Sequence, residues 1–433
     1  MSIDDSRENS FSSPFVNREL SWIDFNERVL EEGLKKDLPP LERFKFLSIV
    51  SSNFDEFFMV RVAAIKQTRQ AGGGTDPSGL SPAELLEKIS RKVHSINDRQ
   101  FNALVNEVFP SLAQGGLSLL RPIEWSAEQR EYLESLFVRE FFPLLTPLRL
   151  GTPTDRSAAG LAEAKETSPL EEEAPLPSIE NYSLYAAFLL EEAFVQSRMD
   201  RNSSPPAEHI SIVRIPPTPE RIVWLSGETL FPSNTGQRCW ALLEDLVQVY
   251  GASFFPGYKV KESLVFKVNR DADFSVDEKR DEDFIVAMAE MLEGRGRSMP
   301  VRMVYSPGSN KIRDYLARRL CLEEDDLYEV AGPLNLGNLY DLILHRGFDH
   351  LREKPWEIYS HPVLHEDQPL WDRIRAGDIY FTCPTSPLIL WSASFRKQRQ
   401  TPMWRPSKPP SIGRAGILPS SGPWNRRAFR ANM

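Results

Sequence analysis

The chain has 433 residues, of which 41% are hydrophobic and 26% charged, as in a soluble globular protein with room for about two to three domains. No run approaches the roughly 18–20 apolar residues of a membrane-spanning helix, and residues 1–9 lack the apolar core of a secretory signal. Three scattered cysteines without C-x-x-C spacing indicate neither a disulfide framework nor a zinc site. These features predict a cytoplasmic protein of several domains.

The net charge is unevenly distributed along the chain. Residues 383–433 contain nine Lys or Arg and no Asp or Glu, so their net charge is +9. Because the whole chain has a net charge of −9, the first 382 residues have a net charge of −18. Clustered Lys and Arg attract polyanions by counterion release, so one interpretation is an arm for nucleic acid or polyphosphate. The other is translation out of frame, since a GC-rich gene read in a shifted frame yields Arg, Pro, Ser and Ala without acidic residues.

Residues 1–117 predict an all-helical domain. Ser21 is expected to cap a first helix whose apolar side holds Trp22, Phe25 and Val29. After two prolines, a second short helix is expected at 41–47.

Two further start signals follow in this domain. Asn53 stands three residues before Glu56 and is expected to cap a third helix. Ser81, followed by a proline and then by Glu84, predicts the start of a long helix. Its buried face is expected to hold Leu85, Ile89, Val93, Ile96, Leu104 and Val108.

Residues 118–360 predict an α+β domain. Ser126 opens another helix, and residues 151–179, rich in Pro, Ala, Ser and Glu, predict a disordered insert with too little apolar content to order itself. The expected strands are 183–190, 210–215, 264–268 and 300–305, and the expected helices are 240–249 and 283–292.

Generic motifs do not identify a function. The sequence contains no G-x-x-x-x-G-K-[ST], no G-x-G-x-x-G and no H-E-x-x-H. His361 and His365 are four residues apart, which suits a metal only on a helix, but Pro362 lies between them. No metal site is therefore predicted.

Three ordered segments carry a specific resemblance. They are 17–30 (NRELSWIDFNERVL), 41–47 (LERFKFL) and 51–61 (SSNFDEFFMVR). This set resembles the N-terminal domain of bacterial polyphosphate kinase, the family with a phosphohistidine intermediate. The likeness continues to about residue 381 through segments that resemble the head domain and the start of the next domain: 255–258 (FPGY), 266–273 (FKVNRDAD), 330–334 (VAGPL) and 372–378 (DRIRAGD).

The resemblance implies one site residue in this part of the chain. In the family the N-terminal domain closes over the nucleotide, and the asparagine of S-x-N-x-D-E-F contacts ATP; carried over, this is Asn53. The alternative is that Asn53 only caps a helix, and the two roles are compatible because a helix N-terminus offers free donors to a nucleotide. The head domain implies a homo-oligomer.

The resemblance breaks after Thr382. The family continues into two phospholipase-D-like domains that hold the phosphate-accepting histidine, whereas here only a stub, 361–382, is expected, so no catalytic residue is assigned. If the last base of each codon is joined to the first two of the next, residues 384–392 permit Y-E-S-[LF]-D-P-V-V, which resembles the family's continuation P-Y-E-S-F-D-P-V-V. Residues 402–414 permit another family segment in the same shifted frame. A frameshift near residue 382 is therefore expected, with 383–433 as a disordered basic tail.

These observations define the predicted function. By resemblance, the reaction is transfer of the γ-phosphoryl group of ATP to polyphosphate through phosphohistidine, with Mg²⁺. The chain as it stands is expected to be inactive, because it lacks the nucleophile. The alternative is a non-catalytic, nucleotide-binding or dimerising fragment. We expect no specific nucleic-acid partner and a cytoplasmic location, peripheral to the inner membrane if the protein joins a larger complex.

Overall fold

The computed structural model describes residues 14–151, 177, 179–193, 208–216, 221–225, 238–272, 298–355 and 375–377. The chain divides into a compact unit, Met1–Glu353, and a second unit, Lys354–Met433. In the second unit only 354–355 and 375–377 are described, the latter as part of a helical turn. The expected phospholipase-D-like stub and basic tail otherwise lie outside the described residues.

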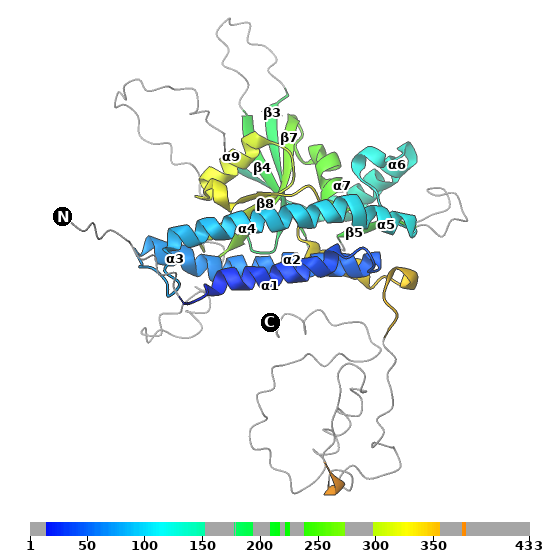
Figure 1. Cartoon of the computed structure of the whole chain (residues 1–433). Coiled ribbons are helices and arrows are strands. Elements are labelled where there is room, and N and C mark those ends of the chain that lie inside the picture. The colour runs from blue at the N-terminus through cyan, green and yellow to red at the C-terminus, as the bar shows by residue number, and fades with distance from the viewer. Residues whose placement is uncertain are drawn as a thin grey trace, which may run out of the picture. The chain divides into compact units, whose positions relative to one another are not determined.

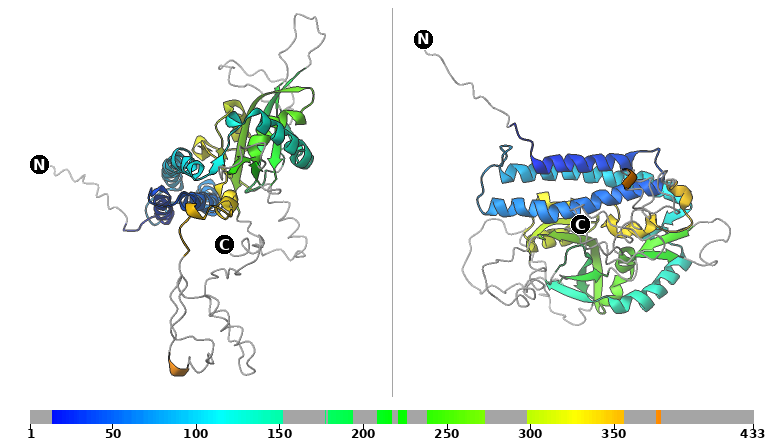
Figure 2. Two further views of the ribbon diagram at one scale, coloured as in Figure 1. Left: turned by 90° about the vertical axis from the view of Figure 1, so that its right-hand side faces the viewer. Right: turned by 90° about the horizontal axis from the view of Figure 1, so that it is seen from below.

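The first part of Met1–Glu353 is a layer of helices. Figure 1 shows the long helices α1, α2 and α4 lying side by side, and the views in Figure 2 agree. Short π-helical segments interrupt the α-helices at two places. The elements are α1 (Arg18–Leu34), α2 (Pro40–Phe57), η1 (Phe58–Val62, π-helical), α3 (Ala63–Gln70), α4 (Pro82–Ala103), η2 (Leu104–Val108, π-helical) and α5 (Phe109–Gln114).

The predicted capping box at Ser81 is confirmed. The Ser81 side chain accepts from the backbone N–H of Glu84, and the Glu84 carboxylate accepts from the N–H of Ser81. This arrangement satisfies two of the donors that a helix start leaves free. All six residues predicted for the buried face, from Leu85 to Val108, are buried.

Two predicted helix starts are wrong. α1 begins at Arg18, capped by the side chain of Asn17 rather than of Ser21. Its buried side holds Ile23, Asn26 and Leu30, while Phe25 is 58% exposed.

Asn53 caps no helix, because α2 runs through it without interruption to Phe57. The reason is burial: Phe54, Asp55 and Phe57 all face the interior, and tertiary packing overrides the local preference of Ser and Asn for caps.

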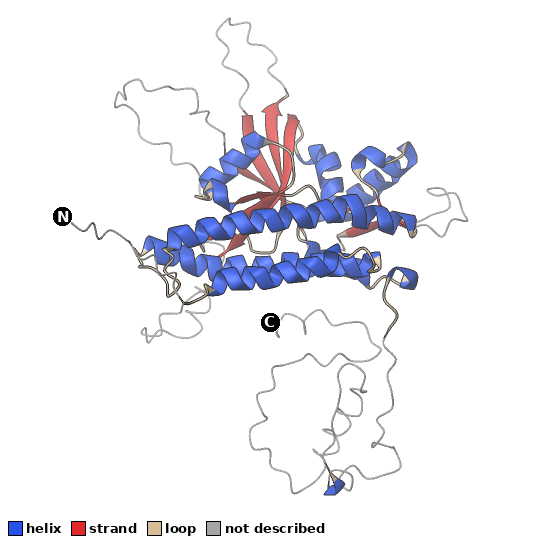
Figure 3. Cartoon of the chain, in the orientation of Figure 1, coloured by secondary structure: helices blue, strands red, loops and turns tan. Residues whose placement is uncertain are grey.

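The second part contains two sheets. The larger has the order β2-β4-β3-β7-β8-β9, antiparallel except for the parallel pair β8–β9, and the smaller has the order β1-β6-β5. Figure 3 shows the larger sheet standing on the helical layer. The strands are β1 (Leu117–Leu119), β2 (Pro147–Gly151), β3 (Leu184–Glu192), β4 (Glu208–Ile215), β5 (Ile222–Leu225), β6 (Arg238–Leu242), β7 (Tyr258–Arg270), β8 (Pro300–Tyr305) and β9 (Leu327–Glu329).

The helices of this second part are α6 (Ala127–Leu136), α7 (Leu243–Tyr250), α9 (Asn310–Arg319) and α10 (Tyr340–Ile343). Further short segments are η3 (Pro122–Glu124), η4 (Phe137–Phe141), η5 (Phe142–Leu144), η6 (Gly251–Phe254), η7 (Glu324–Asp326), η8 (Leu336–Leu339) and η9 (Asp349–Leu351).

All four predicted strands exist, and β7 is longer than expected. The helix predicted at 240–249 is wrong in its first three residues, which end strand β6, while the helix predicted at 283–292 lies outside the described residues. The predicted disordered insert is wrong at its two ends, since Gly151 closes β2 and Ile179 is fully buried. Residues 152–176 are not described.

Strand β3 is buried on both faces, which explains its continuous apolar run. Leu184, Ala186, Phe188 and Leu190 join a hydrophobic core that they share with the long helices. The alternate residues Tyr185, Ala187 and Leu189 join a second core under α9. The period of two along a strand thus divides its side chains between two helical layers.

The helical layer and the larger sheet share more than apolar contacts. Arg302 of β8 lies between the rings of Phe58 and Tyr328, 4.5 and 4.4 Å from their centroids. His94 of α4 stacks on the same Tyr328 at 4.0 Å, and burial, with Arg302 nearby, lowers the pKa of His94. Lys66 of α3 pairs with Asp326 at 2.5 Å.

One hydrophobic core therefore spans the predicted boundary between residues 117 and 118. The predicted domain limits remain predictions.

Asp245 in the first turn of α7 is a buried acid with incomplete pairing. It is 2% exposed; Arg121 lies 3.5 Å from Oδ1, and Oδ2 has no partner among the described residues. Burial raises the pKa of Asp245 to about 7. The folded state therefore holds this proton more tightly than the unfolded chain, and the contribution of Asp245 to stability falls as the pH rises from about 4 to 7.

We predict that Asp245→Asn stabilises the protein more at pH 8 than at pH 5, by about 1–3 kcal/mol. The measurement is urea denaturation of both proteins at the two pH values. Asp37→Asn, at an exposed loop position, is the control and should show no such difference. An Asp245→Asn effect that is equal at both pH values would contradict the assignment.

Candidate functional site

The structure places Asn53 within α2, half-buried and in contact with α1. Its Nδ2 donates to Oδ1 of Asn26 at 2.8 Å. Asn26 is fully buried and Asn53 is half-buried, so the bond joins the interior to the surface. Within the described residues the Oδ1 of Asn53 accepts no hydrogen bond, so it is available to a donor from solvent.

Aromatic rings lie along the same helix pair. Trp22 of α1 stacks on Phe57 of α2 at 4.5 Å with an angle of 6° between the planes. It also meets Phe54 edge to face at 6.1 Å. These contacts fix the spacing of the two helices one turn from the Asn26–Asn53 bond. Asn53 thus lies next to closely packed aromatic side chains of α1 and α2.

On the inner side of the same turn, Asp55 forms a buried ion pair with the sheet. Both of its oxygens accept from Lys267 Nζ at 2.7 Å, and Asn269 Nδ2 lies 3.3 Å from Oδ1. The side chains of Asp55 and Lys267 are 4% and 5% exposed. Burial lowers the pKa of Lys267, and the Asp55 carboxylate opposes that effect.

Sequence reasoning missed this pair, because Lys and Asp are usually exposed. A signal was present: Lys267 and Asn269 are two apart, which puts both on one face of a strand, and they fall in an otherwise apolar segment. The sequence predicts only that Asp55 is a first-turn charge or a member of a structural ion pair; the ion pair is confirmed, and its partner Lys267 is the part that was not predicted.

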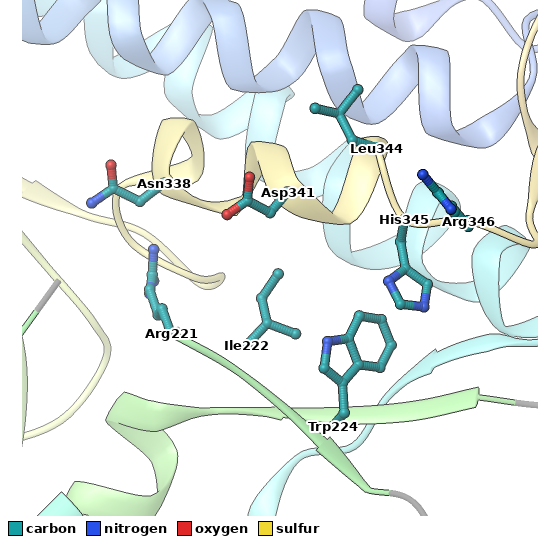
Figure 4. A pocket seen from close by; sticks show the side chains of 8 residues that line it. All are labelled: Arg221, Ile222, Trp224, Asn338, Asp341, Leu344, His345 and Arg346. Atoms are coloured by element: carbon teal, nitrogen blue, oxygen red, sulfur yellow. The ribbon is translucent and has the colours of Figure 1, made fainter. Parts of the chain in front are cut away.

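A cavity of about 350 Å³ lies between strand β5 of the smaller sheet and a segment that comprises η8, α10 and the residues after α10. Its walls are Arg221, Ile222, Trp224, Asn338, Asp341, Leu344, His345 and Arg346. His345 lies over the ring of Trp224 at 4.1 Å (Figure 4). The volume is within the range of small-molecule sites.

Arg221, in the wall of this cavity, is already paired within the fold. Its guanidinium pairs with Glu244 and also donates to the carbonyls of Leu334 and Asn335. Arg221 therefore ties the residues just before η8 to α7 and to the start of β5 rather than presenting an unpaired cation. η8 itself lies against α2 next to Asn53, because a Cβ at Gly337 would lie 2.4 Å from Ser52 Oγ.

The described residues do not supply a metal site. Among them no three His, Cys, Asp or Glu side chains converge so as to hold an ion. The Mg²⁺ implied by the resemblance therefore finds no fitting ligand set in this part of the chain. The pair His361 and His365 lies outside the described residues. None of the described helices is long and apolar enough to cross a membrane.

Comparison with known proteins identifies two domains in sequence. Residues 15–120 match the family model described as the polyphosphate kinase N-terminal domain, and residues 168–342 match that of the polyphosphate kinase middle domain. The chain is similar to the polyphosphate kinase of Lactiplantibacillus plantarum, with 32% identity over 86% of this chain and 47% of the relative. For that of Synechocystis sp. the identity is 34%, over 81% and 44%.

The fold agrees with a solved structure. The chain resembles the crystal structure of a polyphosphate kinase from Porphyromonas gingivalis, with a TM-score of 0.65 and 24% identity over 90% of this chain and 50% of that one. The chain spans about half the length of the relatives it matches. The helical domain followed by an α+β region is the predicted order. By these matches the chain belongs to the polyphosphate kinase family and contains its N-terminal and middle domains.

Proposed function

We propose that this chain supplies a nucleotide-contacting part of a polyphosphate kinase, with Asn53 as the contact. The observation that carries the proposal is how the Asn53 side-chain amide is bonded. Its N–H donates to the buried Asn26, while its oxygen has no partner among the described residues. Such an oxygen suits the amino group of an adenine base. Because Asn26 already holds the amide, little side-chain entropy is lost when a nucleotide binds.

The proposed reaction of the whole enzyme is transfer of the γ-phosphoryl group of ATP to the end of a polyphosphate chain through phosphohistidine. Mg²⁺ would supply charge neutralisation at the moving phosphoryl group. The part of the chain described here would bind and orient the nucleotide and would not itself hold the transferred group.

We also propose that the protein forms a homo-oligomer through its α+β region and works in the cytoplasm. Support for the first point lies in β2, an edge strand with one paired side. Leu144 and Leu148, before and within it, are 55% and 38% exposed. An edge strand with apolar neighbours is a surface that natural proteins usually cover.

The nucleotide contact is tested with Asn53→Ala and Asn53→Asp in the full chain. We expect Asn53→Ala to weaken ATP binding about five- to tenfold, the value of one hydrogen bond. Asn53→Asp should weaken it less, because a carboxylate oxygen can still accept from the amino group of the base. The aspartate variant should keep the stability of the wild type, because Asn26 can turn its amide and donate to the new carboxylate. Calorimetric titration with ATP and thermal denaturation measure the two quantities.

Asn102→Ala is the matched control, since Asn102 is an exposed helical asparagine bonded to Asn106. It should bind ATP like the wild type. Wild-type affinity in Asn53→Ala, or no ATP binding by the wild type, would refute the assignment.

A second proposal concerns residues 383–433, which we attribute to a reading-frame shift near residue 382. Their lack of acidic residues supports it, as do the two family segments permitted in the shifted frame. Sequencing the gene across the codons for residues 371–433 should show the family's continuation in the other frame. A gene in which that frame is closed by early stop codons would contradict the proposal.

A further inference from the structure

The end of α2 is held from two opposite sides. Asn53 and Asp55 are two residues apart, which on an α-helix separates their side chains by about 200°. Asn53 faces the surface and Asp55 faces strand β7, where Lys267 binds both of its oxygens at 2.7 Å. Any rotation of this turn about the helix axis moves both side chains together.

The bidentate geometry makes the pair sensitive to rotation. Lys267 contacts both carboxylate oxygens equally, and Asn269 adds a contact to one of them. Both partners are almost fully buried, so no water replaces a lost contact. A Lys ammonium can follow small movements of a carboxylate, but a rotation large enough to separate the pair would leave two buried charges unpaired, a penalty that apolar contacts alone do not impose.

The residues that follow prevent the helix from sliding along the sheet. In the π-helical segment η1, the carbonyl of Met59 accepts from the backbone N–H of Ala272, just beyond β7, at 3.0 Å. Phe58 stacks under Arg302, and Lys66 pairs with Asp326. π-helical turns of this kind often occur at functional sites, because they redirect side chains within a continuous helix.

We infer that the Asp55–Lys267 pair is a positioning device that fixes the rotation of α2 against strand β7 and so sets where the Asn53 oxygen meets a nucleotide. The inference rests on the proposed nucleotide contact at Asn53. It implies that the helical layer does not move against the sheet when a nucleotide binds. If the N-terminal helices close over a nucleotide, they must then move together with the sheet.

The test compares single and double replacements in the full chain. Asp55→Asn and Lys267→Met each leave a buried group without its partner and should lower both stability and ATP affinity. The double variant Asp55→Leu/Lys267→Met replaces the pair by apolar side chains, which commonly restores stability. We expect its ATP affinity to stay roughly fivefold below that of the wild type, since the contact that fixes the rotation is gone.

A purely structural pair would predict a different result, with stability and affinity recovering together in the double variant. That result would overturn the inference even if neither single variant folds. The control is Asp24→Leu/Lys92→Met, which removes an exposed pair between α1 and α4 and should leave ATP affinity unchanged.

A second readout needs no nucleotide. Amide hydrogen exchange of residues 50–57 should be faster in the double variant than in the wild type at equal global stability. If the wild type fails to bind ATP, the proposed function fails, and this exchange measurement still decides whether the pair orders the end of α2. Unchanged exchange there would overturn the inference.

Discussion

The buried ion pair between Asp55 and Lys267 is the contact on which the arrangement of the described fold depends. Two charges that have lost their water are stable only if each is satisfied by the other, which requires the helical layer to lie against strand β7 at one distance and one rotation. The hydrophobic core shared by both parts supplies the driving force. The ion pair, the Met59–Ala272 backbone bond and the Arg302 stack determine which of many apolar packings is adopted.

This constraint has a direct consequence for the surface of the protein. Asn53 lies on the same helical turn as Asp55, so the sheet fixes its position although it does not touch the sheet. Asn26 accepts a hydrogen bond from the Asn53 amide N–H, and the Asn53 side-chain oxygen has no partner among the described residues. If Asn53 contacts a nucleotide as proposed, a side chain held in this way would lose little freedom on binding. The chain matches the N-terminal and middle domains of a family whose compared members are about twice as long.

Much of the fold could be predicted from the sequence, and the failures have physical causes. The Ser81 capping box is a local signal that no distant contact opposes, and the strands follow from β-branched and aromatic runs. Asn53 illustrates where prediction from local sequence fails. The segment Ser-Ser-Asn-Phe-Asp-Glu resembles a helix start, and only the burial of Phe54 and Phe57 shows that it lies inside a helix. The resemblance implied Asn53 as a site residue, which remains a proposal. Its partner Asn26 is 27 residues away in sequence, and Lys267 is 212 residues away from Asp55. No pattern within a single segment contains that information.

The central claim is that the helical layer and the sheet form one rigid, cooperative unit. Urea unfolding tests it most directly, with a fluorescent reporter on α1 (Arg28→Cys) in one protein and on β7 (Lys259→Cys) in another, both exposed positions, after replacement of the three native cysteines. We predict transitions with the same midpoint and slope, which shift together when Lys267→Met is added. Two separated transitions, or a shift confined to one reporter, would contradict the claim.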